Sequence, residues 1–313
     1  MAGECGTGSE NVSIPVAVAA CVAMSVLYVL ILYAPTVILR LRPPSSFTSF
    51  MIRRFVCAAV SSSASLAATA VILSTRNWEA SRLLGIYGIR ADHLWQAIVY
   101  PLSLTSLMYA GSFVLKLLLL LKSWRENHGG CSSLYRIRSF IQTIPSQLFS
   151  FASNVSVWRN FVVGPVTEEL VFRSCMIPLL LCAGLRVHIA IFLCPILFSL
   201  AHLNHFMELY IKHNRNVLKA SAIVGLQLGY TAVFGSYASF LFIRTGHFVS
   251  PLVAHIFCNY MGLPVFFARG NGLVTAVFLA GLVAFMMLLF PLTNPEFYND
   301  RTSDCRCWHG YCS

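Results

Sequence analysis

Long apolar runs separated by short polar connections dominate the hydropathy pattern of this chain of 313 residues. A helix needs about 20 apolar residues to cross the hydrocarbon layer of a bilayer. The pattern predicts eight spanning helices, in residues 14–39, 55–74, 94–121, 161–183, 187–203, 219–243, 247–268 and 272–291. Pro178 and Pro195 interrupt the fourth and fifth runs, which membrane helices tolerate where neighbours satisfy the freed backbone groups. The sequence therefore predicts an all-α, polytopic transmembrane bundle.

No internal repeat or low-complexity linker divides these runs, so we expect one integral membrane domain over residues 1–313. The first run, 14–39, is too long for the apolar core of a signal peptide and predicts a retained spanning helix. The composition agrees, because 57% of the residues are hydrophobic and only 11% are charged. A soluble domain of this length needs more charge to cover its surface, so the composition excludes that class.

Lysine and arginine in the short loops predict the orientation of the chain. One side collects Arg40, Arg42, Arg53, Arg54, Lys122, Arg125, Arg136, Arg138, Arg159, Lys212, Arg215, Lys219 and Arg269. The other side collects Arg76, Arg82, Arg90, Arg186, Arg244, Arg301 and Arg306. The richer side is predicted to be cytosolic, with both termini in the lumen. The net charge of +11 then suits an anionic cytoplasmic leaflet. Basic residues scattered in short loops argue against nucleic-acid binding, which needs them clustered on one soluble face.

Nine of the eleven cysteines fall into two groups. Those within apolar runs are predicted to behave as small buried hydrophobes: Cys21, Cys57, Cys175, Cys182, Cys194 and Cys258. The second group lies in the polar C-terminal tail: Cys305, Cys307 and Cys312. The sequence does not decide whether these three cysteines are oxidised, acylated or free.

Three polar clusters interrupt the apolar runs and carry the candidate chemistry. Ionisable groups inside a membrane segment cost about 3 kcal/mol each, so they are rare and usually functional. The clusters are residues 167–173 (Thr-Glu-Glu-Leu-Val-Phe-Arg), residues 198–205 with His202, and residues 255–259 (His-Ile-Phe-Cys-Asn).

In the first cluster, Glu169 and Arg173 are four residues apart, so on a helix they form an ion pair on one face. Glu168 is turned about 100° away and lacks that partner, which suits a general base or an acid that returns its proton. Pro165 lies just ahead, and Thr167 as a helix N-cap would place both glutamates in the first turn. The alternative is a structural charge cluster that packs helices together.

In the third cluster, His255 and Asn259 are also four residues apart on one helix face. Two such hydrogen-bonding side chains aimed together can stabilise an oxyanion. Each alone is equally consistent with an interhelical hydrogen bond, worth about 1 kcal/mol in membranes. In combination with Glu168 and His202, the pair indicates a peptidase site.

Other chemistries fit the same residues less well. Two glutamates and several histidines could bind zinc, and His202 and His205 are three residues apart, but the chain has no His-Glu-x-x-His motif. We therefore expect no cofactor, and a metal-free water activated by Glu168 and His202. Ser199 and Cys258 lie near the clusters, but neither has a recognisable nucleophile elbow or base partner.

Together the clusters resemble the type II CAAX prenyl endopeptidases, within the wider family of membrane peptidases that carry a Glu-Glu-x-x-x-Arg motif. The matching stretches are Arg159-Asn160, residues 164–173, Phe198-x-x-x-His202 and His255-x-x-x-Asn259. Further likeness lies in residues 230–235, 240–247 and 258–262. The resemblance is dense over 158–295, predicts a catalytic core at about 158–268, and rests on hydropathy alone in the first third.

The resemblance implies an eight-helix protein of the endoplasmic reticulum membrane that removes the last three residues after an isoprenylated cysteine. The implied substrates are isoprenylated CaaX proteins such as Ras-like GTPases. In this family's pattern, Glu168 and His202 activate the attacking water, and His255 and Asn259 hold the oxyanion. The prenyl chain stays in the lipid bilayer while its peptide reaches a site open to the cytosolic side.

Glu169 and Arg173 also belong to the motif, and we expect them to orient and support the site. One alternative of a different class remains open: a non-proteolytic scaffold or transport-related membrane protein whose polar clusters join helices. That alternative does not require an unpaired glutamate beside one that is already paired.

Overall fold

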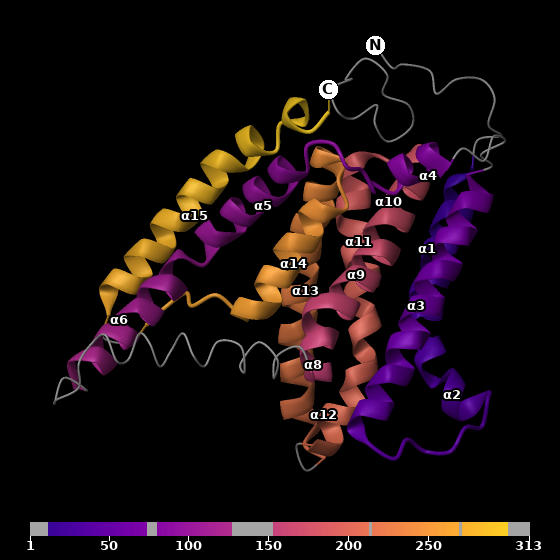
Figure 1. Cartoon of the computed structure of the whole chain (residues 1–313), viewed down its shortest axis with the longest axis horizontal. Helices are drawn as coiled ribbons and strands as arrows, with labels where there is room; N and C mark the ends of the chain where they lie inside the picture. Colours follow the sequence, from indigo (N-terminus) through magenta and orange to yellow (C-terminus); the bar gives the residue numbers. More distant parts are fainter. Residues whose placement is uncertain (1–11, 74–79, 127–152, 213–214, 269–270, 300–313) are drawn as a thin grey trace.

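A computed structural model describes residues 12–73, 80–126, 153–212, 215–268 and 271–299 of the chain. Every secondary-structure element among these residues is helical, which confirms the predicted all-α class. Figure 1 shows a bundle of upright helices with an inclined group, α5, α6 and α15, along one side.

Four helical segments in the described part of the chain are long and apolar enough to cross a membrane. They are residues Ile14–Val37, α3 (Phe47–Ile72), α13 (Val217–Thr245) and α15 (Gly272–Leu292). The first consists of α1 (Ile14–Leu30), a 3-10 turn and α2 (Ala34–Val37). These long apolar helices confirm the polytopic membrane architecture.

The predicted helix over 94–121 is bent rather than straight. Helices α5 (Leu94–Met108) and α6 (Ala110–Glu126) meet at 71° and count as a fifth span if they cross together. Tyr109 lies at the break, and its hydroxyl donates a hydrogen bond to the carbonyl oxygen of Gly262, 2.7 Å away. Helix α15 packs on the bent pair at Gly281, where an added Cβ would lie 2.3 Å from the carbonyl oxygen of Leu107. Small residues of this kind let helix backbones approach closely.

The other predicted runs form shorter helical segments. Residues 155–182 are helical throughout and include two π-helical turns; α11 spans Val187–Ala201, and α14 spans Val249–Met261. Helix α14 ends seven residues before the predicted end of its run at 268, because Gly262 adopts φ 72°. Two further short helices are α4 (Ala80–Ile86) and α12 (Phe206–Lys212).

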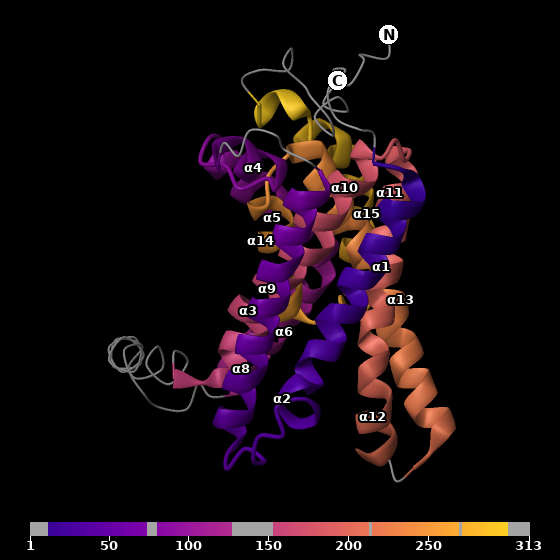
Figure 2. The same ribbon diagram turned by 90° about the vertical axis from the view of Figure 1, so that its right-hand side faces the viewer.

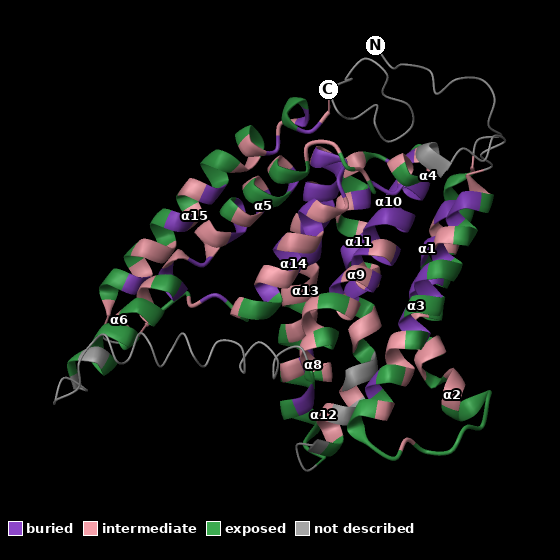
Figure 3. Ribbon diagram, in the orientation of Figure 1, coloured by how far each residue is buried: buried purple, intermediate pink, exposed green. Residues whose placement is uncertain are grey.

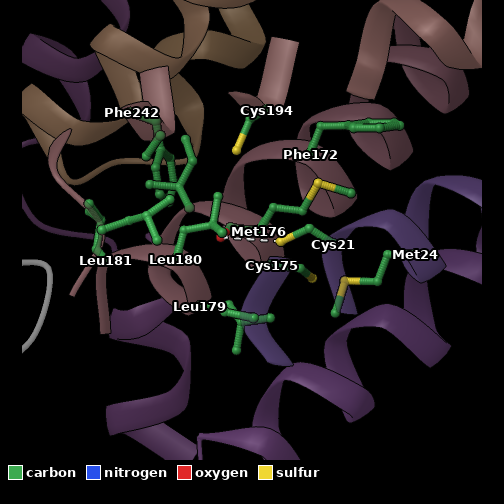
Figure 4. Close-up of a cluster of buried hydrophobic side chains, with 14 of the residues drawn as sticks. Cys21, Met24, Phe172, Cys175, Met176, Leu179, Leu180, Leu181, Cys194 and Phe242 are labelled. Atoms are coloured by element: carbon green, nitrogen blue, oxygen red, sulfur yellow. Dashed lines mark hydrogen bonds between the residues drawn. The ribbon is translucent and has the colours of Figure 1, made fainter. Parts of the chain in front are cut away.

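The core surrounds α10 (Met176–Cys182), which is coloured as buried and lies toward the end of the bundle nearer the two termini (Figure 3). Residues Met176–Leu181 are all buried, so this apolar helix is covered by its neighbours on every side. Figure 4 shows Cys21 of α1, Cys194 of α11 and Phe242 of α13 packed around it. Five of the six cysteines predicted to be buried are buried, Cys182 is intermediate, and the tail cysteines lie outside the described residues.

Two groups of helix ends lie at opposite ends of the molecule. The first turn of α1 and the last turn of α15 lie at one end (Figure 1). The first turns of α3, α8 (Val155–Trp158) and α13 lie toward the other (Figure 2). These three helix starts carry or precede Arg53, Arg54, Arg159 and Lys219, so basic residues predicted for one side do gather at one end.

Candidate active site

Glu168 and Glu169 lie in α9 (Gly164–Glu169), in the middle of the helical path that begins at α8. The side chain of Asn154 caps the start of that path, because its Oδ1 accepts a hydrogen bond from the backbone N–H of Ser156 at 2.9 Å. Two π-helical turns, Arg159–Val163 and Leu170–Cys175, flank α9. Such turns occur frequently at functional sites, where they change the direction in which neighbouring side chains point.

The prediction that Thr167 caps the helix and places the glutamates in its first turn is wrong. The helix begins well upstream, so Thr167 lies within it and needs another hydrogen-bond partner. Its hydroxyl donates to the carbonyl oxygen of Val163 at 2.7 Å, which leaves its oxygen to accept from the hydroxyl of Tyr28 at 2.9 Å. Thr167 thereby joins α9 to α1 beside the glutamates.

Glu169 is fully buried, and its carboxylate organises the centre of the site. Its Oε1 accepts from Nη1 of Arg173 at 3.1 Å, so the predicted ion pair is confirmed. The same oxygen accepts from Nδ1 of His255 at 2.7 Å. Arg173 is also fully buried, lies 4.8 Å from the centre of the Phe198 ring and donates through Nη2 to the carbonyl oxygen of Gly235 at 3.3 Å. This network joins α9, the π-helical turn Leu170–Cys175, α11, α13 and α14.

His255 lies between the two glutamates. Because Nδ1 is bonded to Glu169, the other ring nitrogen is turned toward Glu168, with Nε2 3.7 Å from Oε2 of that residue. Phe234 packs edge-on against the imidazole at a centroid distance of 5.1 Å. The sequence predicted only the Arg173 partner of Glu169, so its contact with His255 is a finding of the structure.

His202 lies in the 3-10 turn that follows α11. Its Nδ1 is 3.0 Å from the carbonyl oxygen of Phe198, an acceptor, so Nδ1 carries the proton and Nε2 is the acceptor in the neutral ring. The ring packs edge-on against that of Phe198, with the centroids 4.9 Å apart. Phe198 therefore sets the orientation of His202 through both its backbone and its ring.

Asn259 follows His255 by one helical turn on α14. Its Nδ2 donates to the carbonyl oxygen of Asn160 at 2.8 Å, which joins the end of α14 to the first π-helical turn. A carboxamide nitrogen carries two N–H groups, so one donor remains for a ligand.

One cavity of about 680 Å³ connects these residues. Glu168, His202, His255 and Asn259 all line it, although they come from three different helical segments. Glu169 and Arg173 are not among the described residues that line the cavity, because they are buried behind His255. The structure thus brings the four predicted catalytic residues to one chamber and places the two supporting residues in the adjoining core.

Several polar residues that line the cavity were not predicted from the sequence to belong to the site. They are Tyr28, Arg54, Gln227, Tyr230 and Thr231. Arg54 was placed in a loop, but α3 begins at Phe47, after the capping Ser46, so Arg54 is helical and faces inward. The capping serine was the available signal for this earlier start.

Neither of the two alternative nucleophiles is among the described residues that line the cavity. Ser199 and Cys258 are absent from its described lining, and the Ser199 hydroxyl donates instead to the carbonyl oxygen of Leu228 at 2.8 Å. His205 has no described side chain. Among the described residues, no group of three or more His, Cys, Asp or Glu side chains lies close enough together to hold a metal ion.

Gly235 supports the site by allowing α13 to approach Arg173. A Cβ at this position would lie 2.9 Å from Cβ of Pro195 and 3.0 Å from Nη2 of Arg173. We therefore expect Gly235→Ala to lower the free energy of unfolding by about 1–3 kcal/mol and to reduce activity. Gly229→Ala is the matched control on the same helix, because a Cβ there meets nothing within 4 Å. Thermal unfolding in detergent measures both; equal stability of the two variants would contradict this packing.

Comparison with known proteins identifies relatives of the chain. The family described as type II CAAX prenyl endopeptidase Rce1-like matches residues 150–261. CAAX prenyl protease 2 of Arabidopsis thaliana is 70% identical over 306 residues, which cover 98% of each chain. CAAX prenyl protease 2 of Homo sapiens is 35% identical over 69% of this chain and 63% of its own length. The Caenorhabditis elegans protein of that name is 30% identical over 76% and 84%.

No solved structure matches the chain significantly. The family match includes Glu168, His202, His255 and Asn259. The similarity to the Arabidopsis relative extends over nearly the whole length of the chain. The chain therefore belongs to the family of type II CAAX prenyl endopeptidases.

Proposed function

We propose that this chain is an intramembrane endopeptidase that removes the C-terminal tripeptide from isoprenylated CaaX proteins, including Ras-like GTPases. The observation that carries the proposal is the single cavity of about 680 Å³ lined by a carboxylate, two imidazoles and a carboxamide. The substrate class is supported by family membership, since the relatives bear the name CAAX prenyl protease 2.

Glu168 and His202 activate the attacking water in this proposal. Glu168 is 22% exposed within the cavity, so a water can reach its carboxylate. The carboxylate takes a proton as the water oxygen bonds to the scissile carbonyl carbon, and His202 orients the same water through Nε2. When the tetrahedral intermediate collapses, the carbon–nitrogen bond breaks and the proton passes to the departing amine.

His255 and Asn259 hold the negative oxygen of that intermediate. Since Nδ1 of His255 donates to Glu169, its Nε2 donates to the oxyanion only when the ring carries a proton on both nitrogens. Their side chains lie one helical turn apart and both line the cavity. Donors fixed before the reaction begins stabilise developing charge without reorganising, and removing one such donor typically lowers the rate by about 10²- to 10³-fold. Glu169 fixes the His255 ring through Nδ1, and Arg173 holds Glu169 in place.

The basic helix ends and the apolar cavity wall support the proposed membrane setting. Phe47, Phe50 and Phe55 of α3 line the same cavity as the polar residues, so it offers an apolar surface beside the proposed reaction centre. Arg54 and Arg159 lie toward the basic end of the molecule, which we assign to the cytosolic face of the endoplasmic reticulum membrane. A prenyl chain can then remain in lipid while the peptide enters from the cytosol.

A pair of peptides tests this function. We expect the purified protein to release the terminal tripeptide from a farnesylated CaaX peptide and to leave its unprenylated twin intact, because the prenyl group supplies much of the apolar binding energy. Mass spectrometry of the products measures both reactions. Equal cleavage of the two peptides, or cleavage of neither, would remove the basis for the proposed substrate class.

The same assay after exhaustive chelation distinguishes the two ways of activating water. We expect activity to survive, since the proposed base is Glu168 itself. Activity that disappears on chelation and returns only with added zinc would assign the water to a metal ion and contradict this part of the proposal.

A further inference from the structure

Two arginines line the cavity in addition to the proposed catalytic residues. Arg54 comes from α3 and Arg159 from the first π-helical turn. Among the described residues that line the cavity, they are the only lysine or arginine side chains, and Glu168 is the only carboxylate. Arg54 is half-buried and Arg159 is exposed.

The neighbouring Arg53, which does not line the cavity, shows that a position in the cavity wall is specific to Arg54. Nη1 of Arg53 donates to the carbonyl oxygen of Arg42 at 2.7 Å, so its charge is directed to the loop before α3. Arg54 instead lies over the ring of Phe50, 5.6 Å from its centre, and both residues line the cavity. Arg53 is therefore a natural control for any experiment on Arg54.

Arg159 also retains donors for a ligand. Its Nε donates to Oδ1 of Asn160 at 2.9 Å. A guanidinium carries five N–H donors in a planar fork, so this bond leaves the two terminal nitrogens able to meet a carboxylate side by side. Asn160 in turn accepts from Asn259 through its carbonyl oxygen, which connects this arginine to the proposed oxyanion site.

The distance between the arginines and the reaction centre matches the length of a tripeptide. The hydroxyl of Ser62 on α3 donates to the carbonyl oxygen of Thr167 at 3.4 Å, so these two residues lie at the same level. Arg54 precedes Ser62 by eight residues, which is about 12 Å along a helix axis. Three residues of extended peptide span about 10–11 Å.

The second arginine lies at a similar distance in the same direction. Arg159 precedes Glu168 by nine residues, which is at most about 13 Å of helical rise, because the π-helical turn Arg159–Val163 rises less per residue than an α-helix. Helix α3 and the path from α8 to α10 both run away from the same end of the molecule (Figure 2), so the two arginines lie on the same side of Glu168. Each side chain is long enough to adjust the position of its charge by several ångströms.

We propose that Arg54 and Arg159 bind the C-terminal carboxylate of the substrate and so position the bond three residues from the chain end beside Glu168. This inference rests on the proposed endopeptidase function and names the part of the substrate that sets the cleavage position. A guanidinium and a carboxylate form short, charge-assisted hydrogen bonds with defined geometry. The pair of arginines therefore recognises a free chain end and rejects an internal peptide segment, which has no carboxylate there.

A competing explanation is that Arg54 simply balances the charge of Glu168. In that case its removal would impair the chemistry on every substrate alike. Carboxylate recognition predicts instead that its removal matters only when the substrate ends in a carboxylate. The two explanations therefore differ in how removal of Arg54 changes the ratio of the cleavage rates of substrates with and without a terminal carboxylate, and not in whether activity falls.

The experiment uses two farnesylated peptides that are identical except for a terminal carboxylate or a terminal carboxamide. We expect the unmodified protein to favour the carboxylate peptide at least tenfold in kcat/KM. Arg54→Gln and Arg159→Gln should each move that ratio toward one, Arg54→Lys should retain part of it, and Arg53→Gln should leave it unchanged. The carboxamide peptide also reports whether each variant is folded and active.

Two results would overturn the inference. One is a ratio of kcat/KM values near one for the unmodified protein acting on the two peptides. This result does not depend on whether any variant folds. The other is a proportional loss on both peptides in Arg54→Gln and Arg159→Gln, with the ratio preserved. Failure of the proposed function itself would look different, since neither farnesylated peptide would be cut by the unmodified protein.

Discussion

Glu168→Gln lowers the cleavage of a farnesylated peptide by about 10²- to 10⁴-fold and leaves the protein folded. The loss follows because glutamine cannot accept a proton from water, and general base catalysis contributes about this factor. The fold persists because Glu168 lies at the cavity surface, 22% exposed, and takes no part in the buried Glu169–Arg173 ion pair. Kinetics of the purified variant and its thermal unfolding in detergent measure the two effects separately.

Glu296→Gln is the control for this substitution, because it is an exposed glutamate outside the cavity whose Oε2 accepts from Asn294. It should retain full activity. Full activity of purified Glu168→Gln would contradict the assignment of the base. A variant that instead loses its fold together with its activity would favour the scaffold alternative, in which the polar cluster joins helices.

Glu169→Ala has the opposite primary effect, although the residue is the next one along the chain. Its removal leaves the fully buried Arg173 without its carboxylate partner, and breaking a buried pair in this way costs about 3–5 kcal/mol. We therefore expect a large fall in the free energy of unfolding. Activity also falls, because His255 loses the acceptor that orients its ring through Nδ1.

Removing both charges distinguishes the effect of the buried ion pair on stability from its effect on catalysis. A Glu169→Gln, Arg173→Met double variant carries no unpaired buried charge, so we expect it to be more stable than Glu169→Ala while remaining impaired in catalysis. Thermal unfolding of the three proteins gives the order. If Glu169→Ala were as stable as the unmodified protein, the pair could not be the organising contact described here.

The helices could be predicted largely from hydropathy, whereas their irregularities could not. Runs such as 219–243 and 272–291 agree with α13 and α15 to within two residues. The bend at Tyr109 depends on contacts with Gly262 and α15, which are distant in sequence and leave no local pattern.

Contacts within one helix of the candidate site could be predicted from the sequence, but contacts between its helices could not. Spacing of four residues on a helix predicts the Glu169–Arg173 contact, because that contact is local. The bond between Glu169 and His255 joins residues 86 positions apart, and only the fold brings them together. The cost of burying polar groups in a membrane and the family resemblance both predicted that the three polar clusters form one site, and the cavity supports that grouping.

The most direct measurement is an experimental structure of Glu168→Gln with an uncleaved farnesylated CaaX peptide bound. The proposal predicts the scissile carbonyl oxygen within hydrogen-bonding distance, about 3 Å, of the side chains of His255 and Asn259. It also predicts a water between position 168 and His202, about 3–3.5 Å from the carbonyl carbon. A peptide whose scissile bond lies outside this cavity, or whose carbonyl faces away from those donors, would contradict the proposed site.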